Sequence, residues 1–314
     1  MNSISLPALS GDSALGILAA MGTVRLLDRA LEGGARLSWN GVSLTAELHV
    51  ALESVDAVVD VLQDIVLRMD DDALIPGLRA GFPPPGAAPD GLRVPQLRLR
   101  ATCEDLFKAM TPTELVEAHA WLASLVTDLA ADGKGRGAIS QLTAPTGRQS
   151  IATMLEKPLE LVKTNPDYLR QALVGWRRVS GVTGENLDHR AIWGAPEDGS
   201  GQAEMRGVPG ATWLALMSFP LFRTTAPARR SVTSGWHTVR SGRRSHQELR
   251  LPLWDAPLGP AGITAVVEHP ILADAEDTSE SQAMLAALGI FHVCRSRRYQ
   301  PPGGQSAGLL SPVP

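Results

Sequence analysis

The sequence predicts an α+β fold, in which a mixed sheet packs against helices, for a chain of 314 residues. Three observations support this fold class. Some segments place apolar residues at helical spacing, other segments alternate them as strands do, and the two kinds of segment follow each other without a regular order. A strict alternation of strands and helices would instead predict a doubly wound parallel sheet. Helices are also expected in the C-terminal part.

The first elements expected are a helix and a β-hairpin. Ser10, Asp12 or Ser13 offers an oxygen atom that can cap a helix, directly before an apolar run with helical period. The segments ARLSW and VSLTAELHV then lie on either side of Asn40-Gly41, a pair that favours a two-residue type I′ turn. The N-terminal region therefore predicts a helix followed by two antiparallel strands.

The middle of the chain predicts two further helices with a strand between them. A strongly acidic helix is expected from about Val55, and the proline-rich stretch 80–91 is expected to be a loop or linker. Residues 92–103 alternate as a strand does. The next helix has the clearest signals, because Thr111 begins a capping box with proline at the first helical position, and Gly133 is expected to end the helix.

The later elements are expected to mix helices and strands. The sequence predicts helices at 147–162, 166–178, about 259–268 and about 279–289, a strand at 246–254, and a mobile loop near 195–210. We divide the chain at residue 140, into an N-terminal α+β region 1–140 and a C-terminal α+β region 141–314 that holds the arginine-rich segments. A single domain is the alternative to this division.

Composition excludes several function classes. Arginine outnumbers lysine 25 to 4, but the formal net charge is −4, so the abundance of arginine is by itself poor evidence for nucleic-acid binding. Cys103 and Cys294 lie far apart, which argues against a disulfide framework or a structural zinc site and fits a reducing cytoplasm. The longest apolar stretch near the N-terminus is interrupted by charges, so we expect neither a signal peptide nor a membrane span, and we predict a cytoplasmic location.

The triplet Gly11-Asp12-Ser13 raises the question of a serine nucleophile. Such a serine needs a base within reach, and the chain has no late Asp-x-x-His pair. We therefore predict that Ser13 caps a helix and that no residue is catalytic. A serine hydrolase that uses Ser13 is an alternative function. The spacing of the histidines predicts no metal site, and the absence of a P-loop motif gives no reason to expect a cofactor.

Arginines gather in two segments of the C-terminal region. In the first segment they accompany Trp236, His237 and His246. Closely spaced arginines with aromatic side chains suit a nucleic-acid backbone, through bidentate phosphate contacts and base stacking. The competing interpretation is a solvated basic face. The candidate phosphate contacts are Arg223, Arg229, Arg230, Arg240, Arg243, Arg244, Arg250, Arg295, Arg297 and Arg298.

The N-terminal run LPALSGDSALGILAAMGTVRLLDRA (6–30), with ARLSW shortly after it, resembles the start of large-subunit and associated proteins of type I CRISPR systems, in particular the I-G class, formerly I-U. The pieces GATWLALMSFPLFR (210–223), ELRLPLWDAPLG (248–259) and PTGRQS (145–150) also resemble that group. Together these pieces cover about a fifth of the chain. The chain is short for a complete large subunit, so an accessory protein is equally compatible.

The resemblance implies a non-catalytic subunit of an RNA-guided surveillance complex of the Cascade type in antiviral defence. Its expected partners are CRISPR RNA and target DNA, the other Cascade subunits and a nuclease-helicase that it helps to recruit, with no membrane. In such effectors pairing with the guide reads most of the sequence, while protein reads the flanking motif and the backbone. Arg148 and Gln149 are candidate groove readers, since arginine suits guanine and glutamine suits adenine.

The acidic segment 53–72 supports a third function class. Its charge would suit a basic partner such as a nuclease, so the alternative is a protein–protein adaptor that docks this partner through the acidic helix.

Overall fold

The computed structural model describes residues 1–84, 91–144, 149–192, 205–241, 244–273, 278–299 and 308–313. Its helices are α1 (Ala14–Ala30), α2 (Val55–Leu67), α3 (Gln96–Phe107), α4 (Pro112–Leu125), α5 (Ile151–Thr164), α6 (Asp167–Val174), α7 (Pro209–Met217), α8 (Pro260–Val267) and α9 (Ser279–Ala287). Its strands are β1 (Asn2–Ser10), β2 (Arg36–Trp39), β3 (Thr45–Val50), β4 (Val126–Ala131), β5 (Gly137–Ile139), β6 (Val179–Ser180), β7 (Arg206–Gly207), β8 (Thr224–Thr225), β9 (Val232–Thr233), β10 (Trp236–Ser241), β11 (Arg244–Trp254), β12 (Ile290–Tyr299) and β13 (Leu309–Pro312).

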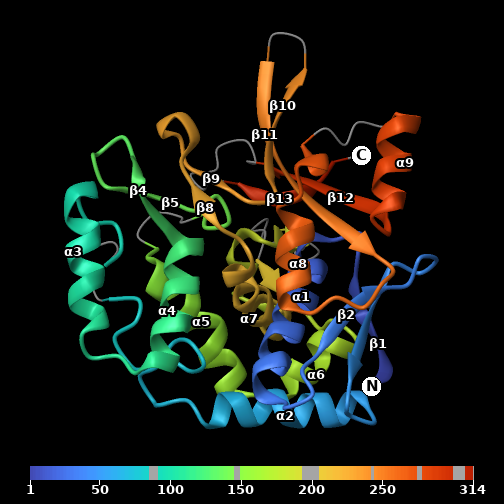
Figure 1. Cartoon of the computed structure of the whole chain (residues 1–314). Helices are drawn as coiled ribbons and strands as arrows, with labels where there is room; N and C mark the ends of the chain where they lie inside the picture. Colours follow the sequence, from blue (N-terminus) through green and yellow to red (C-terminus); the bar gives the residue numbers. More distant parts are fainter. Residues whose placement is uncertain are drawn as a thin grey trace, which may run out of the picture.

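The strands form antiparallel sheets, and the α+β fold class is confirmed. One sheet has the order β1-β3-β2 and another the order β10-β11-β12-β13, while β4-β5, β6-β7 and β8-β9 are two-stranded. All the pairings that the structure describes are antiparallel, so several antiparallel sheets take the place of the expected mixed sheet. In the C-terminal part the larger sheet accompanies the expected helices α8 and α9 (Figure 1).

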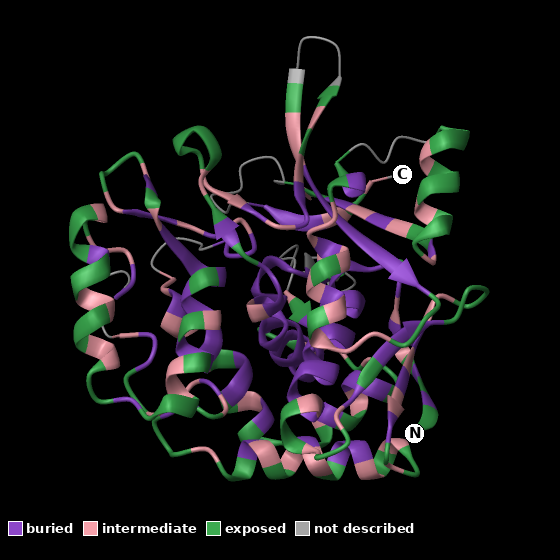
Figure 2. Cartoon of the chain, viewed as in Figure 1, coloured by how far each residue is buried: buried purple, intermediate pink, exposed green. Residues whose placement is uncertain are grey.

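Helices α1 and α7 pack against each other in the middle of the fold (Figure 1). Figure 2 shows both helices as largely buried. They approach very closely at Gly22, where an added Cβ atom would lie 1.7 Å from the backbone oxygen of Leu214. A continuous apolar cluster joins residues on both sides of position 140, among them Leu18, Trp121 and Leu251. The N-terminal and C-terminal regions thus share one core.

The expected starts of three helices agree with the structure. The Thr111 hydroxyl accepts the N–H of Glu114 at the start of α4, and the Glu114 carboxylate accepts the N–H of Thr111, which is the predicted capping box. Ser54 caps the acidic helix α2 through its side chain. Ser13 occupies the N-cap position of α1, and its backbone oxygen accepts the N–H of Ile17, but its hydroxyl makes no capping hydrogen bond.

The structure corrects two predicted elements. Residues 92–103 were expected to form a strand, but they lead into helix α3, which buries Leu99 and leaves Leu97 94% exposed. The helix expected to continue to Gly133 ends at Leu125 instead. The β-branched residues that follow this helix form strand β4, which pairs with β5. The hydrogen bonds of this pairing satisfy the backbone groups of these residues.

The predicted hairpin is present, but its turn is longer than expected. Strands β2 and β3 pair in antiparallel register with Trp39 opposite Ala46. The Asn40 side chain accepts the N–H groups of Val42 and Ser43, so an Asx-type loop replaces the two-residue type I′ turn. The left-handed residue of this loop is Leu44, with φ 56°.

Several later predictions are also confirmed. Helices α5, α6, α8 and α9 and strand β11 form where they were expected, although α6 ends at Val174 rather than near residue 178. The predicted mobile loop near 195–210 lies largely outside the described residues, and from residue 205 the chain forms β7 and the start of α7. No described helix combines the length and the apolar character that a bilayer crossing requires.

Candidate nucleic-acid interface

Strands β10 and β11 form a hairpin that extends beyond the body of the fold (Figure 1). The ladder between β11 and β12 starts only at Leu249, which pairs with Ser296, so the earlier residues of β11 pair with β10 alone. This geometry leaves the outer part of the hairpin free of β12. The hairpin holds Arg240, whereas Arg243 lies outside the described residues. Arg244 is in β11, but its side chain is not described.

Arg250 is inside the fold, which argues against the predicted phosphate contact. It is 4% exposed, and its Nη1 donates to the carbonyl oxygens of Leu272 at 2.6 Å and Ala273 at 2.9 Å. Its Nε lies 3.5 Å from Oε2 of Glu248, which is also buried. Arg250 therefore connects β11 to the segment after α8 rather than facing a ligand.

The guanidinium of Arg298 also makes its contacts inside the protein. Its guanidinium donates to four carbonyl oxygens, including those of Gln141 at 3.0 Å, Leu142 at 2.9 Å and Gly308 at 3.0 Å. It lies over the ring of Trp236, 5.6 Å from the ring centre. Burial lowers the pKa of Arg298 to about 10. These contacts give Arg298 a structural role beneath the hairpin.

The side chains of two other candidate residues donate hydrogen bonds to carboxylates. Arg223 donates through Nε and Nη2 to the two oxygens of Glu268, and the ion pair lies on the surface. The Gln149 side-chain amide donates to the carboxylate of Glu185. The amide therefore faces into the protein and not toward a base in a nucleic-acid groove. Arg148 lies outside the described residues.

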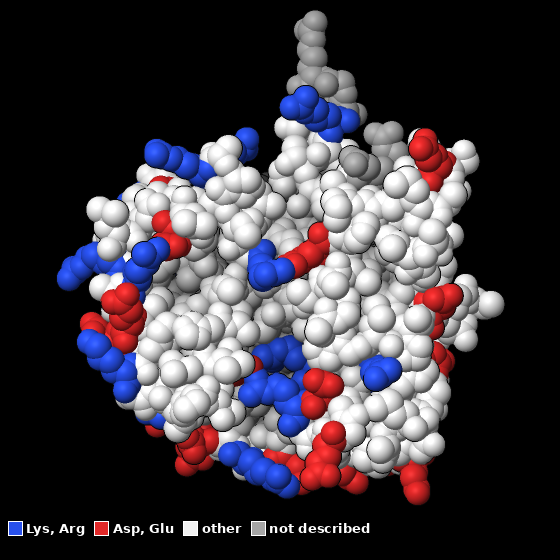
Figure 3. Space-filling view, in the orientation of Figure 1, with Lys and Arg blue, Asp and Glu red and all other residues white. Residues whose placement is uncertain are grey.

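Four of the predicted arginines are exposed, and within the described ranges their guanidinium groups have no carboxylate partner. Arg229 and Arg230 are at the turn between β8 and β9, Arg240 is in the hairpin, and Arg297 is in β12. Arg295 is half-buried and already takes part in an interaction within the protein. In Figure 3 basic side chains occupy the outer part of the hairpin and the region of the β8–β9 turn.

A cavity of about 360 Å³ lies at the base of the hairpin. It forms where β11 and β12 diverge, and it is lined by Gln141, Thr143, Trp236, His246, Gln247, Arg297 and Arg298. His246 is held by a 2.7 Å hydrogen bond to Glu248. The sequence did not predict Gln141 and Thr143 at this place, because they come from the segment after β5 and reach the hairpin only through the tertiary fold.

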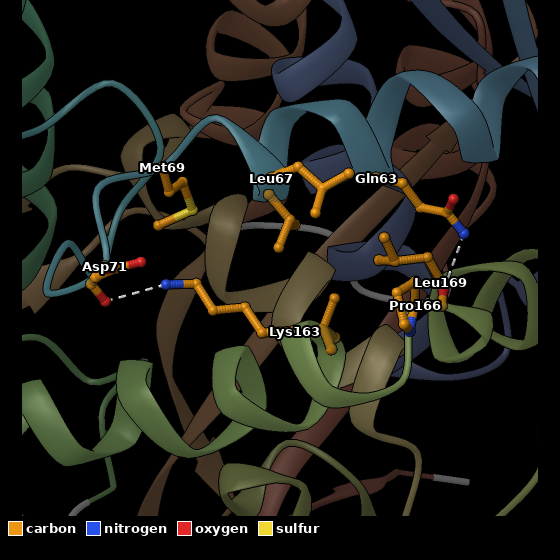
Figure 4. A pocket seen from close by; sticks show the side chains of 9 residues that line it. Gln63, Leu67, Met69, Asp71, Lys163, Pro166 and Leu169 are labelled. Carbon is orange, nitrogen blue, oxygen red and sulfur yellow. Dashed lines mark hydrogen bonds between the residues drawn. The ribbon is translucent and has the colours of Figure 1, made fainter.

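The acidic helix α2 presents a second surface with a distinct chemistry. Its exposed carboxylates include Asp60, and an acidic run follows at 70–72. A cavity of about 230 Å³ lies between α2 and the α5–α6 region, lined in part by Leu67, Met69 and Leu169 (Figure 4). Leu67 is 75% exposed there, so an apolar patch lies directly beside the acidic surface.

The geometry around Ser13 gives little support to a hydrolase site. Ser13 is 7% exposed, and within the described part of the chain no hydrogen bond joins its hydroxyl to a histidine. Burial lowers the pKa of His189, and the charges of Asp188 and, least of all, Asp12 oppose this shift only in part. Across the described residues, His, Cys, Asp and Glu side chains do not gather into a group of three that could hold a metal ion.

No family model and no curated protein matches this chain.

Proposed function

We propose that this protein is a nucleic-acid-binding, non-catalytic subunit of an RNA-guided CRISPR complex of the Cascade type. In this proposal its partners are CRISPR RNA, target DNA, the other subunits and a nuclease-helicase, in the cytoplasm. The observation that carries the proposal is a set of exposed arginines around the protruding hairpin to which the described residues supply no carboxylate partner: Arg229, Arg230, Arg240 and Arg297. The sequence resemblance of the N-terminal helix supports the assignment to this class.

The physical reason is electrostatic. An arginine that is paired inside the protein gains little from a phosphate, whereas an exposed and unpaired guanidinium can form bidentate bonds to it. Arg250 is buried and donates to two carbonyl oxygens, Arg298 donates to four, and Arg223 is neutralised by Glu268. The interface proposed here is therefore smaller than the arginine count suggests, and it consists of the hairpin, the β8–β9 turn and the end of β12.

We expect simultaneous replacement of Arg229, Arg230, Arg240 and Arg297 by alanine to weaken binding to a fluorescein-labelled 30-mer DNA, single-stranded or duplex. Each phosphate neutralised contributes roughly −0.9 to the slope of log Kobs against log salt on a duplex, and roughly −0.7 on a single strand. If each arginine neutralises one phosphate, the slope should become shallower in this variant by up to about 3.6 on a duplex and about 2.8 on a single strand. Fluorescence anisotropy at a series of salt concentrations measures it, with an RNA of the same sequence in parallel.

The matched control replaces four exposed arginines on other elements, namely Arg36, Arg68, Arg98 and Arg177. Both variants change the net charge equally, so a non-specific effect of charge would weaken both to the same extent. Equal slopes for the two variants, or a wild-type slope near zero, would contradict the proposed interface.

The surface of α2 favours a second candidate function, the docking of a basic protein segment. An exposed Leu67 beside an apolar cavity, within an acidic surface, suits a partner helix that carries one apolar anchor among lysines and arginines. We infer that this surface, rather than the hairpin, is where such a partner would dock.

For this second candidate, an amphipathic peptide of 18 residues with lysines on one face and leucines on the other is a suitable probe. We expect Leu67→Ser to weaken its binding about tenfold, because burial of a leucine side chain contributes about 1.5–3 kcal/mol. Val42→Ser, at a 95% exposed position on another element, is the control. Similar affinities for both variants would show that the peptide binds by charge alone.

A further inference from the structure

The cavity at the base of the β10–β11 hairpin (Figure 1) is formed by four separate parts of the chain. They are the segment after β5, the first residue of β10, the first half of β11 and the end of β12. Its volume of about 360 Å³ lies within the range of small-molecule pockets, about 300–1,000 Å³. The proposed interface uses only Arg297 among the lining residues, and the other side chains indicate what kind of group the cavity accepts.

The indole N–H of Trp236 is a buried donor to which the described residues offer no acceptor. Trp236 is 4% exposed and lines the cavity. A buried indole N–H usually has a partner, because an unpaired buried donor costs free energy. Trp39 and Trp213 also carry such an N–H, but neither residue lines this cavity. Trp236 can therefore donate to an acceptor atom of a group that enters the cavity.

The side-chain amides of Gln141 and Gln247 are held in one orientation. The backbone N–H of Thr233 donates to Oε1 of Gln141 at 3.0 Å, which fixes the amide nitrogen on the opposite side. This nitrogen donates to Oε1 of Gln247 at 3.2 Å, and the Gln247 nitrogen donates to the Thr238 hydroxyl at 2.6 Å. An amide nitrogen carries two N–H groups. In the described ranges the second N–H of each amide has no acceptor, so both amides can still donate to a ligand.

His246 supplies a flat surface at a fixed position. Its Nε2 lies 2.7 Å from Oε1 of Glu248. The His246 side chain is 35% exposed, whereas that of Glu248 is 6% exposed. Unpaired bases stack on imidazole rings as they do on other aromatic side chains. A base in the cavity can therefore stack on the accessible part of the His246 ring while its edge meets the donors.

The charges that line the cavity do not cancel. Its described lining residues include Arg297 and Arg298 but no aspartate or glutamate. Arg298 donates to carbonyl oxygens, which leave its positive charge in place. Glu248, the partner of His246, also faces Arg250, 3.5 Å from its Nε. Arg297 is exposed, and no carboxylate of the described residues pairs with it, so an anionic group beside the cavity is favoured.

We propose that this cavity holds one unpaired base of a single-stranded nucleic acid, an inference that rests on the proposed nucleic-acid interface. The edge of the base accepts from Nε1 of Trp236 and from the second N–H of Gln247, and its ring stacks on His246. The phosphate next to this base binds Arg297. A bare phosphate would leave the neutral donors and the imidazole surface without a partner, and a base inside a duplex has its edge occupied.

Fluorescence anisotropy with two fluorescein-labelled strands tests the proposal. One strand consists of twelve thymidines, whose carbonyl oxygens suit the donors of the cavity. The other strand is an abasic chain of the same length, which keeps the deoxyriboses and the phosphates but lacks the bases. We expect the wild-type protein to bind the thymidine strand about tenfold more tightly than the abasic strand, the effect of one stacked base.

Trp236→Phe removes the indole N–H and keeps an aromatic ring in its place. We expect this variant to reduce the preference for the thymidine strand about 3- to 10-fold, the effect of one lost hydrogen bond, without weakening the abasic strand. Trp39→Phe is the matched control, because it removes another buried and unpaired indole N–H outside the cavity. The same preference in both variants would overturn the proposed base site.

A crosslink gives a readout that does not depend on the stability of a variant. A thymidine strand with 5-iododeoxyuridine at alternate positions is irradiated on the wild-type protein, which is then digested with trypsin and analysed by mass spectrometry. We expect the crosslinks on peptides 231–240 and 245–250, which contain Trp236 and His246. Crosslinks confined to other peptides, such as the one that begins at the exposed Tyr299, would overturn the assignment to this cavity.

The two strands also separate this inference from the proposed interface. The variant that lacks Arg229, Arg230, Arg240 and Arg297 should bind both strands more weakly, because it loses phosphate contacts. Equal and salt-dependent binding of both strands by the wild-type protein would overturn the base site and retain the interface. Absence of binding to either strand would overturn the interface as well.

Discussion

Replacement of Gly22 by alanine is expected to lower the free energy of unfolding by about 3 kcal/mol. The added Cβ atom would lie 1.7 Å from the backbone oxygen of Leu214 and 2.8 Å from its carbonyl carbon. Backbone atoms of a buried helix cannot rotate away as a flexible side chain can. Helices α1 and α7 would therefore have to separate, and the packing around them would be lost. The intrinsic preference of alanine over glycine in a helix, about 1 kcal/mol, offsets only part of this cost.

Urea unfolding measures this effect, with the midpoint and the slope analysed separately. Gly133→Ala is the control, because an added Cβ atom at that position meets nothing within 4 Å. We expect this control to stay within about 0.5 kcal/mol of the wild type, as surface substitutions usually do. A Gly22→Ala protein as stable as the control would mean that α1 and α7 do not cross as closely as the structure has them.

Local signals in the sequence were sufficient where short-range chemistry decides the structure. The capping box at Thr111, the acidic helix after Ser54 and the pairing of β2 with β3 each depend on residues only a few positions apart. The helix at 96–107 was missed because its apolar residues alternate over a short stretch. Only Leu99 among these apolar residues is buried. The tertiary contacts of this segment, and not its hydrophobic pattern, therefore determine that it forms a helix.

The arginine clusters show where sequence patterns reach their limit. Arg297 and Arg298 are neighbours, but side chains on a strand alternate between faces, so Arg297 is exposed whereas Arg298 lies over Trp236. Alternation alone could have separated these two. It could not have shown that the face with Arg250 is covered, since that depends on the segment at Leu272, which returns to the sheet after α8.

Arg25 and Arg29 both pair with the buried carboxylate of Glu117, and no sequence pattern predicts this arrangement. Position 117 is 92 residues from position 25 along the chain, and α1 and α4 meet only in the folded protein. Arg25 lies in the buried part of α1, where it is 6% exposed. It requires an anionic partner, and Glu117 supplies one.

Replacement of Glu117 by glutamine is expected to destabilise the protein by about 3–5 kcal/mol. Glutamine retains an oxygen that can accept from Trp121, so the hydrogen bond of the indole survives and the lost charge dominates. Arg25, whose pKa burial already lowers to about 10, would then be a buried cation without a counter-ion, next to the second cation Arg29. Desolvation of that unpaired charge is the source of the cost.

The exposed pair of Arg68 and Asp64 provides the comparison, because their side chains are 81% and 59% exposed. Asp64→Asn should cost no more than about 0.5 kcal/mol, since solvent screens the pair. The double variant Glu117→Gln with Arg25→Met should lose less free energy of unfolding than the sum of the two single variants, by about 0.5–3 kcal/mol. The reason is that Arg25→Met removes the buried cation that Glu117→Gln leaves unpaired. Additive costs, or a loss below 1 kcal/mol for Glu117→Gln alone, would show that Glu117 does not compensate Arg25 in the folded protein.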